Sequence, residues 1–352
     1  MEGVGVTFWS GRRVFVTGHT GFKGSWLTLW LRRLGAEVTG YALPPATNPS
    51  HYEVANAGDG IRSIFADIRD AQKMQEALAA SRAEVVFHLA AQSLVRASYE
   101  MPRETYEVNV IGTVNVLDAV RACHSVRSVV IVTSDKCYEN REWSWGYRES
   151  DPLGGHDPYS SSKAAAEIVT AAYRASYFRA PNAARIASAR AGNVIGGGDW
   201  ARDRLIPDLV TAFAEGRKPL IRNPRATRPW QFVLDPLYGY MLLAERLCED
   251  ESFAEAWNFG PEDRDVRSVG AIVDRVATLW GNGAAVERDT AAQPHEAQFL
   301  KLDSSKARTR LGWSSLLDVD KALEWTVRWY RNPTADQTRA DIDAYSALLP
   351  LL

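Results

Sequence analysis

The sequence predicts an α/β fold in which a doubly wound parallel β-sheet carries a smaller, interleaved C-terminal α+β lobe. Short β-branched runs alternate with stretches whose apolar residues recur at helical spacing, and glycines end the first of these runs. This alternation is typical of βαβ units, in which helices cover both faces of a parallel sheet. The chain has 352 residues, of which 46% are hydrophobic, so it can bury one large core or two smaller ones.

The expected elements alternate regularly up to residue 192. The first strand is expected at 13–17, and the helix that follows, at 22–34, ends at Gly35 as a C-cap. Further strands are expected at 37–42, 61–66, 84–89, 126–133 and 185–190. Further helices are expected at 71–80, 105–122 and 159–177.

Beyond Gly192 the pattern becomes less regular. A glycine turn at 196–198 and a proline-bearing stretch indicate a smaller lobe, whereas a helical run at 235–248 and a strand-like run at 256–260 return to the main sheet. We therefore expect two interleaved domains. The main domain comprises 1–192 and about 231–262, and the smaller lobe comprises about 193–230 and 263–352.

Charge and cysteine content exclude several classes of protein. The formal net charge of −2 lacks the basic excess of a nucleic-acid binder. The three scattered cysteines, Cys123, Cys137 and Cys248, have no metal-ligand spacing, so we expect no metal, and their sparse, odd number favours a reducing compartment. We see neither a signal-like apolar start nor an apolar run of about 18 residues, so we expect a cytoplasmic protein that does not cross a membrane.

Three glycines stand where the first strand meets the first helix. Glycine allows a tight turn and a close backbone approach to a pyrophosphate, which the helix N-terminus then attracts. This context favours a Rossmann-type dinucleotide site over an ordinary βα turn. The expected cofactor-binding residues of this turn are Gly18, Thr20, Gly21, Phe22, Lys23 and Gly24.

The second strand lacks the acidic residue that usually holds the adenosine ribose, because Tyr41, Ala42 and Leu43 stand in its place. No arginine cluster is present there to hold a 2′-phosphate, which favours NAD over NADP. Asp67, with its neighbour Ile68, is a candidate contact of the adenine. Asp67 could equally be a helix N-cap, or serve as both.

Tyr159 and Lys163 are one helical turn apart and share a helix face. An adjacent ammonium favours the phenolate, so we expect the pKa of Tyr159 to be lowered toward the range of a general base. A solvated surface pair is the alternative. Ser134 ends a buried strand at the sheet edge where ligands bind, and it could hydrogen-bond the same substrate hydroxyl.

These motifs, together with the segment 88–92 and Asn109 before a Gly-Thr pair, stand in the order found in extended short-chain dehydrogenases/reductases, which the chain resembles over nearly its whole length. The resemblance implies that Tyr159 is the base, that Lys163 binds the nicotinamide ribose and Tyr159, and that Ser134 is the hydroxyl partner. It also implies that the cofactor contacts Leu89, Ala90, Ala91, Asn109 and Thr133.

The residues after Ser134 resemble those of nucleotide-sugar 4,6-dehydratases in this family, which usually carry Thr-Asp-Glu here. The resemblance implies that Asp135 protonates the departing C6 hydroxyl. Lys136 replaces the glutamate that removes the C5 proton, so it is a C5 base of lowered pKa, a stabiliser of enolate charge, or an ion-pair partner of Asp135 or Glu139.

Further segments, at 143–149, 190–200, 228–231, 257–261 and 294–297, are similar to dehydratases of this family that act on CDP-glucose, which the resemblance implies as substrate. A nucleotide-sugar 4-epimerase, a dehydratase of another nucleotide sugar and a non-catalytic NAD-binding protein are the alternatives.

A nucleotide sugar brings a diphosphate, which guanidinium groups bind in bidentate fashion. A solvated surface position is an equal alternative for each arginine. The candidate substrate contacts are His88, Gln92, Arg96, Ser134, Asn193, Arg204, Arg228 and His295. The resemblance also implies a homo-oligomer, a dimer or a tetramer, paired through the helices at 105–122 and 159–177.

Overall fold

The computed structural model describes residues 6–221, 223–281, 283–288 and 300–349. Seven strands form the main sheet in the order β10-β6-β5-β4-β1-β2-β3, and every neighbouring pair is parallel. This confirms the expected doubly wound sheet. The strands are β1 (Arg13–Thr17), β2 (Glu37–Ala42), β3 (Arg62–Phe65), β4 (Val85–His88), β5 (Ser128–Val132), β6 (Arg185–Ala191) and β10 (Ala256–Phe259).

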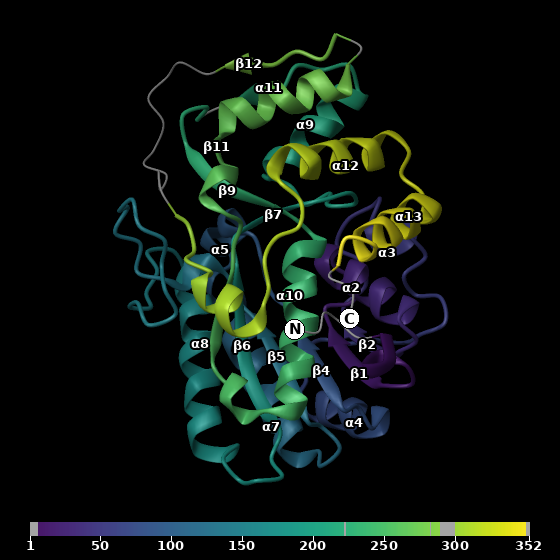
Figure 1. Cartoon of the computed structure of the whole chain (residues 1–352), viewed down its shortest axis with the longest axis vertical. Coiled ribbons are helices and arrows are strands. Elements are labelled where there is room, and N and C mark those ends of the chain that lie inside the picture. The colour runs from purple at the N-terminus through teal and green to yellow at the C-terminus, as the bar shows by residue number, and fades with distance from the viewer. Residues whose placement is uncertain (1–5, 222, 282, 289–299, 350–352) are drawn as a thin grey trace.

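Helices cover both faces of this sheet (Figure 1). Alternate residues of β1 point to opposite sides: Val14 and Val16 join one core cluster and Phe15 joins the other. The first cluster receives apolar residues of α2 (Phe22–Arg33) and α10 (Leu234–Glu249), and the second receives those of α4 (Ala71–Ser81) and α7 (Gly112–Ala122). The long helix α8 (Pro158–Tyr177) packs beside α7.

Further short helices lie before β1 and in the connections that follow the strands. They are α1 (Val6–Trp9), α3 (His51–Val54), α5 (Val95–Glu100) and α6 (Pro102–Tyr106), with the 3₁₀ turns η2 (Asp135–Cys137), η3 (Glu251–Phe253) and η4 (Asp263–Asp265). The π-helical turns are η1 (Glu107–Ile111) and η5 (Ala307–Leu311).

The helix expected at 105–122 is therefore not continuous. The π turn η1 separates α6 from α7 and widens the backbone around Asn109. The side chain of Asn109 is held by Gln92 and Ser162, so tertiary hydrogen bonds accompany this local change of helical pitch.

The smaller lobe forms two sheets of its own above the carboxyl ends of the main strands (Figure 1). One sheet consists of β7 (Asn193–Ile195), β9 (Thr227–Phe232) and β11 (Val266–Ser268), and the other of β8 (Leu220–Ile221) and β12 (Glu287–Arg288). Its helices are α9 (Leu205–Ala214), α11 (Val269–Trp280), α12 (Val319–Arg331) and α13 (Ala335–Ser346).

The division between the lobes is less sharp than expected. Residue 231, the expected boundary, lies inside β9. Helix α13, expected in the smaller lobe, packs against α2 of the main domain, where the ring of Tyr345 meets Trp30 edge-on at 5.5 Å between centroids. Both lobes share one large hydrophobic cluster, so they are built on a continuous core.

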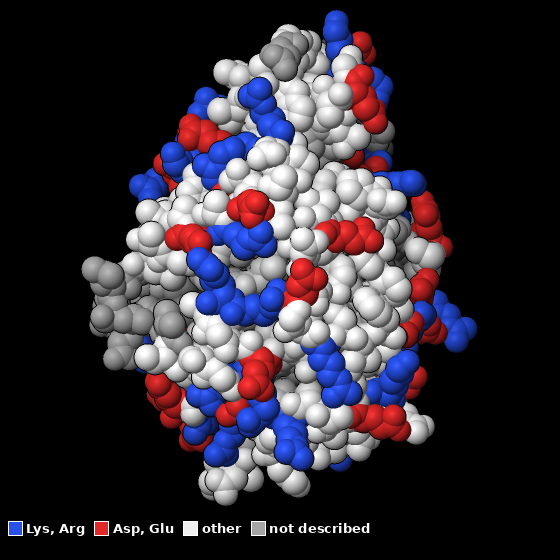
Figure 2. All heavy atoms as spheres, turned by 90° about the vertical axis from the view of Figure 1, so that its right-hand side faces the viewer, with Lys and Arg blue, Asp and Glu red and all other residues white. Residues whose placement is uncertain are grey.

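The surface mixes both signs of charge. Lys and Arg side chains are interspersed with Asp and Glu over the face in Figure 2, as the net charge of −2 suggests. Among the described residues, no helix is long and apolar enough to cross a membrane, and no cluster of His, Cys, Asp or Glu could hold a metal ion.

Candidate active site

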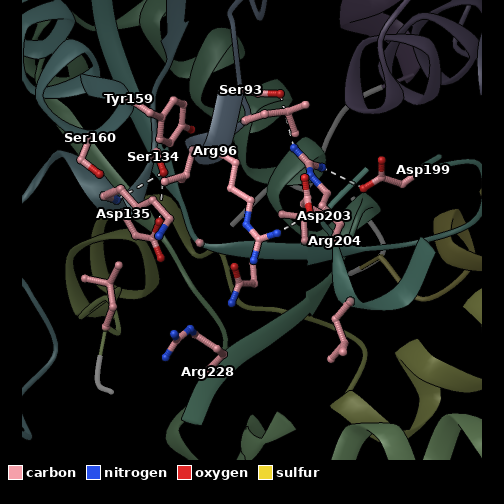
Figure 3. A pocket seen from close by; sticks show the side chains of 18 of the residues that line it. Ser93, Arg96, Ser134, Asp135, Tyr159, Ser160, Asp199, Asp203, Arg204 and Arg228 are labelled. Atoms are coloured by element: carbon pink, nitrogen blue, oxygen red, sulfur yellow. Dashed lines mark hydrogen bonds and ion pairs between the residues drawn. The ribbon is translucent and has the colours of Figure 1, made fainter. Parts of the chain in front are cut away.

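A cavity of about 1440 Å³ lies between the carboxyl ends of the main strands and the smaller lobe. The strand order reverses between β1 and β4, and ligands of such sheets bind at this point. Many of the expected site residues line the cavity: Phe22, Lys23, Leu89, Ala91, Arg96, Thr133, Ser134, Asp135, Lys136, Tyr159, Lys163, Asn193, Arg204 and Arg228. Figure 3 shows several of them pointing toward one another.

The glycine turn is shaped to hold a phosphate group. Gly18 has φ +75°, and a Cβ there would lie 2.7 Å from the amide nitrogen of Ala90. A Cβ on Gly24 would lie 2.0 Å from the carbonyl oxygen of Gly18, so neither glycine has room for a side chain. Gly21 begins α2 without any side-chain cap, which leaves amides of the first turn available to a pyrophosphate. The turn thus fits a dinucleotide cofactor.

Lys23 brings an ammonium into the cavity, a feature that the glycine pattern alone does not reveal. Burial lowers the pKa of Lys23 to about 8, and the nearby cations Arg204 and Lys163 lower it further. The carboxylates of Asp135 and Asp199 oppose this shift. The only signal in the sequence is a lysine next to the third glycine of the turn.

The residues after β5 form a capped 3₁₀ turn. Ser134 caps η2 by accepting a hydrogen bond from the amide of Lys136 (3.2 Å), and its hydroxyl donates to Asp135 Oδ1 (3.0 Å). Burial raises the pKa of Asp135, although the Lys136 ammonium and the Ser134 hydroxyl oppose the shift. A buried carboxyl of raised pKa suits a proton donor.

Lys136 lines the cavity beside Asp135. Among the described residues, its ammonium makes no ion pair with Asp135 or Glu139, and Glu139 pairs with Arg141 instead (3.1 Å). The ion-pair alternative for Lys136 is therefore not supported by the geometry.

Tyr159 and Lys163 lie in the first turns of α8, which Asp157 caps by accepting from the amide of Ser160 (2.9 Å). Both side chains are buried and line the cavity, so they are not a solvated surface pair. The expected fall in the pKa of Tyr159 is wrong for this structure. Burial raises the pKa of Tyr159 to about 12, outweighing a hydrogen bond with Ser134, and burial lowers the pKa of Lys163 to about 8.

Two of the candidate phosphate ligands are paired with carboxylates. Arg204 donates to Asp199 (2.8 Å), and Arg96 donates to Asp203 (2.7 Å), as Figure 3 shows. Arg228 lies on β9, where it faces the cavity and opposes the rise in the pKa of Asp135.

Among the predicted contacts that do not line the cavity are three polar side chains near the loop after β4. His88 is buried between Thr17 (2.8 Å) and Thr113 (3.1 Å), and burial lowers the pKa of its ring to about 3. Gln92 bonds to Leu94 within its own loop, and Asn109 holds the backbone of Gln92 (2.8 and 2.9 Å). These side chains shape the loop after β4 instead of facing the cavity.

The side chains of the residues expected near the adenine of the cofactor contact other residues of the chain. Asp67 accepts from the amide and guanidinium of Arg69, and Asp70, not Asp67, caps α4. Thr20 donates to the carbonyl of Leu43 (2.8 Å). Ile68 packs against Gly112, where a Cβ would lie 2.8 Å from its Cγ2. His295 lies outside the described residues.

A dinucleotide turn on the first strand of a parallel sheet, with Ser134, Tyr159 and Lys163 in one cavity, defines the class of extended short-chain dehydrogenases/reductases. Within this class, residues 15–326 match the family model described as GDP-mannose 4,6 dehydratase, and the chain belongs to that family.

Curated and solved proteins agree with this assignment. The chain is 53% identical over 329 residues, 92% of each chain, to CDP-glucose 4,6-dehydratase of Salmonella typhimurium. It is similar to the structure of DesIV, a dTDP-glucose 4,6-dehydratase from Streptomyces venezuelae with NAD and TYD bound (26% identity, TM-score 0.78, 91% of this chain and 97% of that one). A UDP-glucose 4-epimerase from Thermotoga maritima shares the fold (20% identity, TM-score 0.78, 91% and 99% covered).

Proposed function

We propose that this protein is an NAD-dependent hydro-lyase that converts CDP-D-glucose to CDP-4-dehydro-6-deoxy-D-glucose and water. The observation that carries the proposal is the 53% identity to CDP-glucose 4,6-dehydratase over 92% of both chains. The cavity supports it, because Ser134, Asp135 and Tyr159 all face it.

The glycine turn would hold the pyrophosphate of NAD at the start of α2, with Gly18 and Gly24 providing the close backbone approach. When bound, NAD would supply a reversible hydride acceptor, so that oxidation of the sugar at C4 and reduction at C6 leave a net dehydration. Lys163 would bind the nicotinamide ribose.

Tyr159 would accept the proton of the O4 hydroxyl while C4 loses its hydride. Ser134 would hydrogen-bond the same oxygen, because its hydroxyl lies beside the phenol. The ketone formed at C4 makes the C5 hydrogen acidic and thereby prepares the elimination.

Asp135 would donate its proton to the C6 hydroxyl, which leaves as water when the C6–O bond breaks. Lys136 would either accept the C5 proton or stabilise the enolate charge while another group accepts it. A proton returns to C5 when the hydride reaches C6. Tyr159 then releases the O4 proton and Asp135 takes up a proton in its place, so atoms and charges balance.

The substrate's diphosphate would be held by Arg204 and Arg228, with Asn193 nearby on β7. Arg204 already carries a carboxylate partner, Asp199, which holds the guanidinium in place on the cavity wall. Arg96 would act from α5 across the cavity.

A panel of CDP-, dTDP-, UDP- and GDP-hexoses tests the proposal, with product mass and alkali-induced enone absorbance as readouts. CDP-glucose should lose one water. A product of unchanged mass that is a C4 epimer would instead indicate a 4-epimerase. Tight NAD binding without turnover would indicate a non-catalytic protein. Faster turnover of a hexose that carries another nucleotide would show that cytosine is not the preferred nucleobase.

We further propose that the protein is cytoplasmic and forms a homo-oligomer through α6, α7 and α8. Large apolar side chains are exposed on α6, on the π turn η1 between α6 and α7, and on α8: Tyr106, Ile111 and Ile168. Sedimentation should show a dimer or tetramer for the wild type and a smaller species for Ile168→Asp. A monomeric wild type would contradict this proposal.

A further inference from the structure

A buried hydrogen-bond network centred on Glu167 lies behind the loop 133–138, which carries Ser134 and Asp135. The proposed mechanism assigns this network no role. Glu167 follows Lys163 by one turn on α8 and is only 3% exposed. Its carboxylate accepts hydrogen bonds from Thr133 Oγ1 (2.5 Å), Ser188 Oγ (2.7 Å) and the guanidinium of Arg190 (2.8 Å). A single carboxylate therefore joins α8 to the ends of β5 and β6.

Arg190 extends this network to the far side of the same loop. Its guanidinium donates to the hydroxyl of Tyr138 (2.6 Å) and lies 4.9 Å from the centroid of that ring. Tyr138 in turn donates to Asn258 on β10 (2.8 Å). The loop that carries Ser134 and Asp135 is thus held at Thr133 on one side and at Tyr138 on the other.

A buried ion pair is weak evidence for a stabilising role, because neutral residues of similar volume can often replace it without loss of stability. The placement of this pair indicates another role. Glu167, the anionic member of the pair, lies within the electrostatic reach of Lys163 and accepts a hydrogen bond from Thr133, the residue that precedes Ser134.

We propose that Glu167 is a positioning residue: its carboxylate anchors the loop that presents Ser134 and Asp135, and its charge keeps the Lys163 ammonium protonated. The reaction that it serves rests on the proposed function, but its effect on Lys163 can be measured without any substrate.

The charges around Lys163 agree with this assignment. Glu167 raises the pKa of Lys163 against the larger effect of burial, and the Cys137 thiol adds a smaller rise. Lys23 and the neutral ring of His88 also lie within electrostatic reach of Lys163. Tyr159 shares its helix. Among the residues that the structure describes, the Lys163 ammonium donates one long hydrogen bond, to the carbonyl of Val132 (3.4 Å).

The first experiment follows the Lys163 titration by NMR of the full chain with ¹³C,¹⁵N-labelled lysine. The sequence has eight lysines, and the signal of Lys163 is assigned by its absence from a Lys163→Arg sample. Glu167→Gln alone would leave Arg190 buried and unpaired, so the variant to measure is Glu167→Gln/Arg190→Met. Its Lys163 midpoint should fall by about one pH unit.

The matched control is Arg12→Met/Glu84→Gln, which neutralises a second ion pair (2.8 Å). This pair lies at the amino-terminal ends of β1 and β4, away from the cavity. This variant should leave the Lys163 midpoint unchanged. An unchanged midpoint in folded Glu167→Gln/Arg190→Met would overturn the electrostatic role. If that double variant does not fold, Glu167→Asp, which retracts the same carboxylate, should shift the midpoint in the same direction, and no shift would overturn the role equally.

The second experiment tests the loop anchor with Thr133→Val, which removes one hydrogen bond and keeps the charges. Single-turnover reduction of NAD by CDP-glucose, measured at saturating NAD, should slow about tenfold, while the Lys163 midpoint stays as in the wild type. An unchanged rate would overturn the anchoring role. Failure of the wild type to reduce NAD would contradict the proposed function instead, and the NMR titration would still decide the role of Glu167.

Discussion

Tyr159 shows what spacing in a sequence can and cannot predict about a catalytic group. The four-residue spacing correctly places Tyr159 and Lys163 in one cavity. It gives no information on burial, which raises the pKa of Tyr159 to about 12 and lowers that of Lys163 to about 8. The phenol is therefore neutral at neutral pH without ligands, and positive charge brought into the cavity would favour its ionisation.

Replacing Tyr159 by Phe should abolish NAD reduction by CDP-glucose, because the variant lacks the phenol to which the proposed mechanism assigns the O4 proton. NAD should still bind, since the glycine turn is untouched. Absorbance of NADH in a single turnover and NAD titration calorimetry measure the two effects. Tyr173→Phe on the same helix is the matched control and should react normally. Wild-type hydride transfer in Tyr159→Phe would assign the proton to another group.

Asp135→Asn should permit oxidation at C4 but slow the elimination, because an amide cannot supply the proton for the leaving hydroxyl. The hydride then has no acceptor at C6, so NADH should accumulate on the enzyme. We expect overall turnover to fall about 10²–10⁴-fold, the usual contribution of a general acid. Stopped-flow absorbance follows NADH, and product mass follows the dehydration. Normal turnover would remove Asp135 from the mechanism.

Lys136→Ala should retard exchange of the C5 hydrogen with deuterated solvent, because the lysine at this position either takes the proton as a neutral amine or stabilises the enolate as an ammonium. Lys136→Arg keeps a permanent positive charge without an accessible base. Exchange restored by Lys136→Arg would indicate enolate stabilisation, whereas exchange lost in both variants would indicate the base. Wild-type exchange in Lys136→Ala would show that another group performs both tasks.

At the scale of elements, the long periodic segments were predictable and the irregular ones were not. The strands of the main sheet and helices such as α2 and α8 follow from apolar periodicity, because tertiary contacts reinforce their local preference. The π turn at Glu107–Ile111 leaves the periodicity of 105–122 intact, so only the structure reveals it. Lys23 was expected as a residue of the cofactor turn, but the glycine motif specifies only the backbone, so the position of its ammonium in the cavity is seen only in the structure.

The junction of β1 and α2 depends on one close approach, and Gly24→Ala tests it. The added Cβ would lie 2.0 Å from the carbonyl oxygen of Gly18, so the turn must shift. We expect a loss of roughly 1–3 kcal/mol in the free energy of unfolding, as for other overpacked sites, together with weakened NAD binding. Urea denaturation and NAD calorimetry measure these effects.

Gly21→Ala is the matched control within the same turn. Its Cβ would lie 3.4 Å from the same oxygen, an ordinary contact, so stability should change by less than about 1 kcal/mol. Equal stability losses in the two variants would show that the close approach at Gly24 has no special importance.

At the scale of the whole molecule, the two lobes depend on each other. Residues after 262 return to the main domain, where α13 packs on α2 and the loop before α12 meets α10. The sequence indicated interleaving from the return of 235–260 to the sheet. It did not indicate the placement of α13, because that helix's contacts involve residues about 110 and 310 positions away.

Asp235 lies at this junction and should make stability depend on pH. Its Oδ1 accepts from the amide of Leu316 (2.7 Å) and from the hydroxyl of Tyr345 (2.7 Å), which ties α10 to the C-terminal segment. Burial raises the pKa of Asp235 to about 7. A raised pKa in the folded state means that the folded chain binds the proton more tightly, so this contribution to stability is full below about pH 4 and is lost as the pH rises through 7.

Asp235→Asn should remove this dependence, because the amide oxygen can still accept both hydrogen bonds but carries no charge. The variant should be more stable than the wild type at pH 8, by about 4 kcal/mol at most, and the gain should shrink toward pH 4. Urea denaturation across pH 4–8 measures the difference. Asp343→Asn, an exposed carboxylate on α13, is the control and should show no such gain. Parallel curves of unfolding free energy against pH for Asp235→Asn and the wild type would mean that Asp235 has the same pKa in the folded and the unfolded chain. Its ionisation would then not destabilise the interlobe junction.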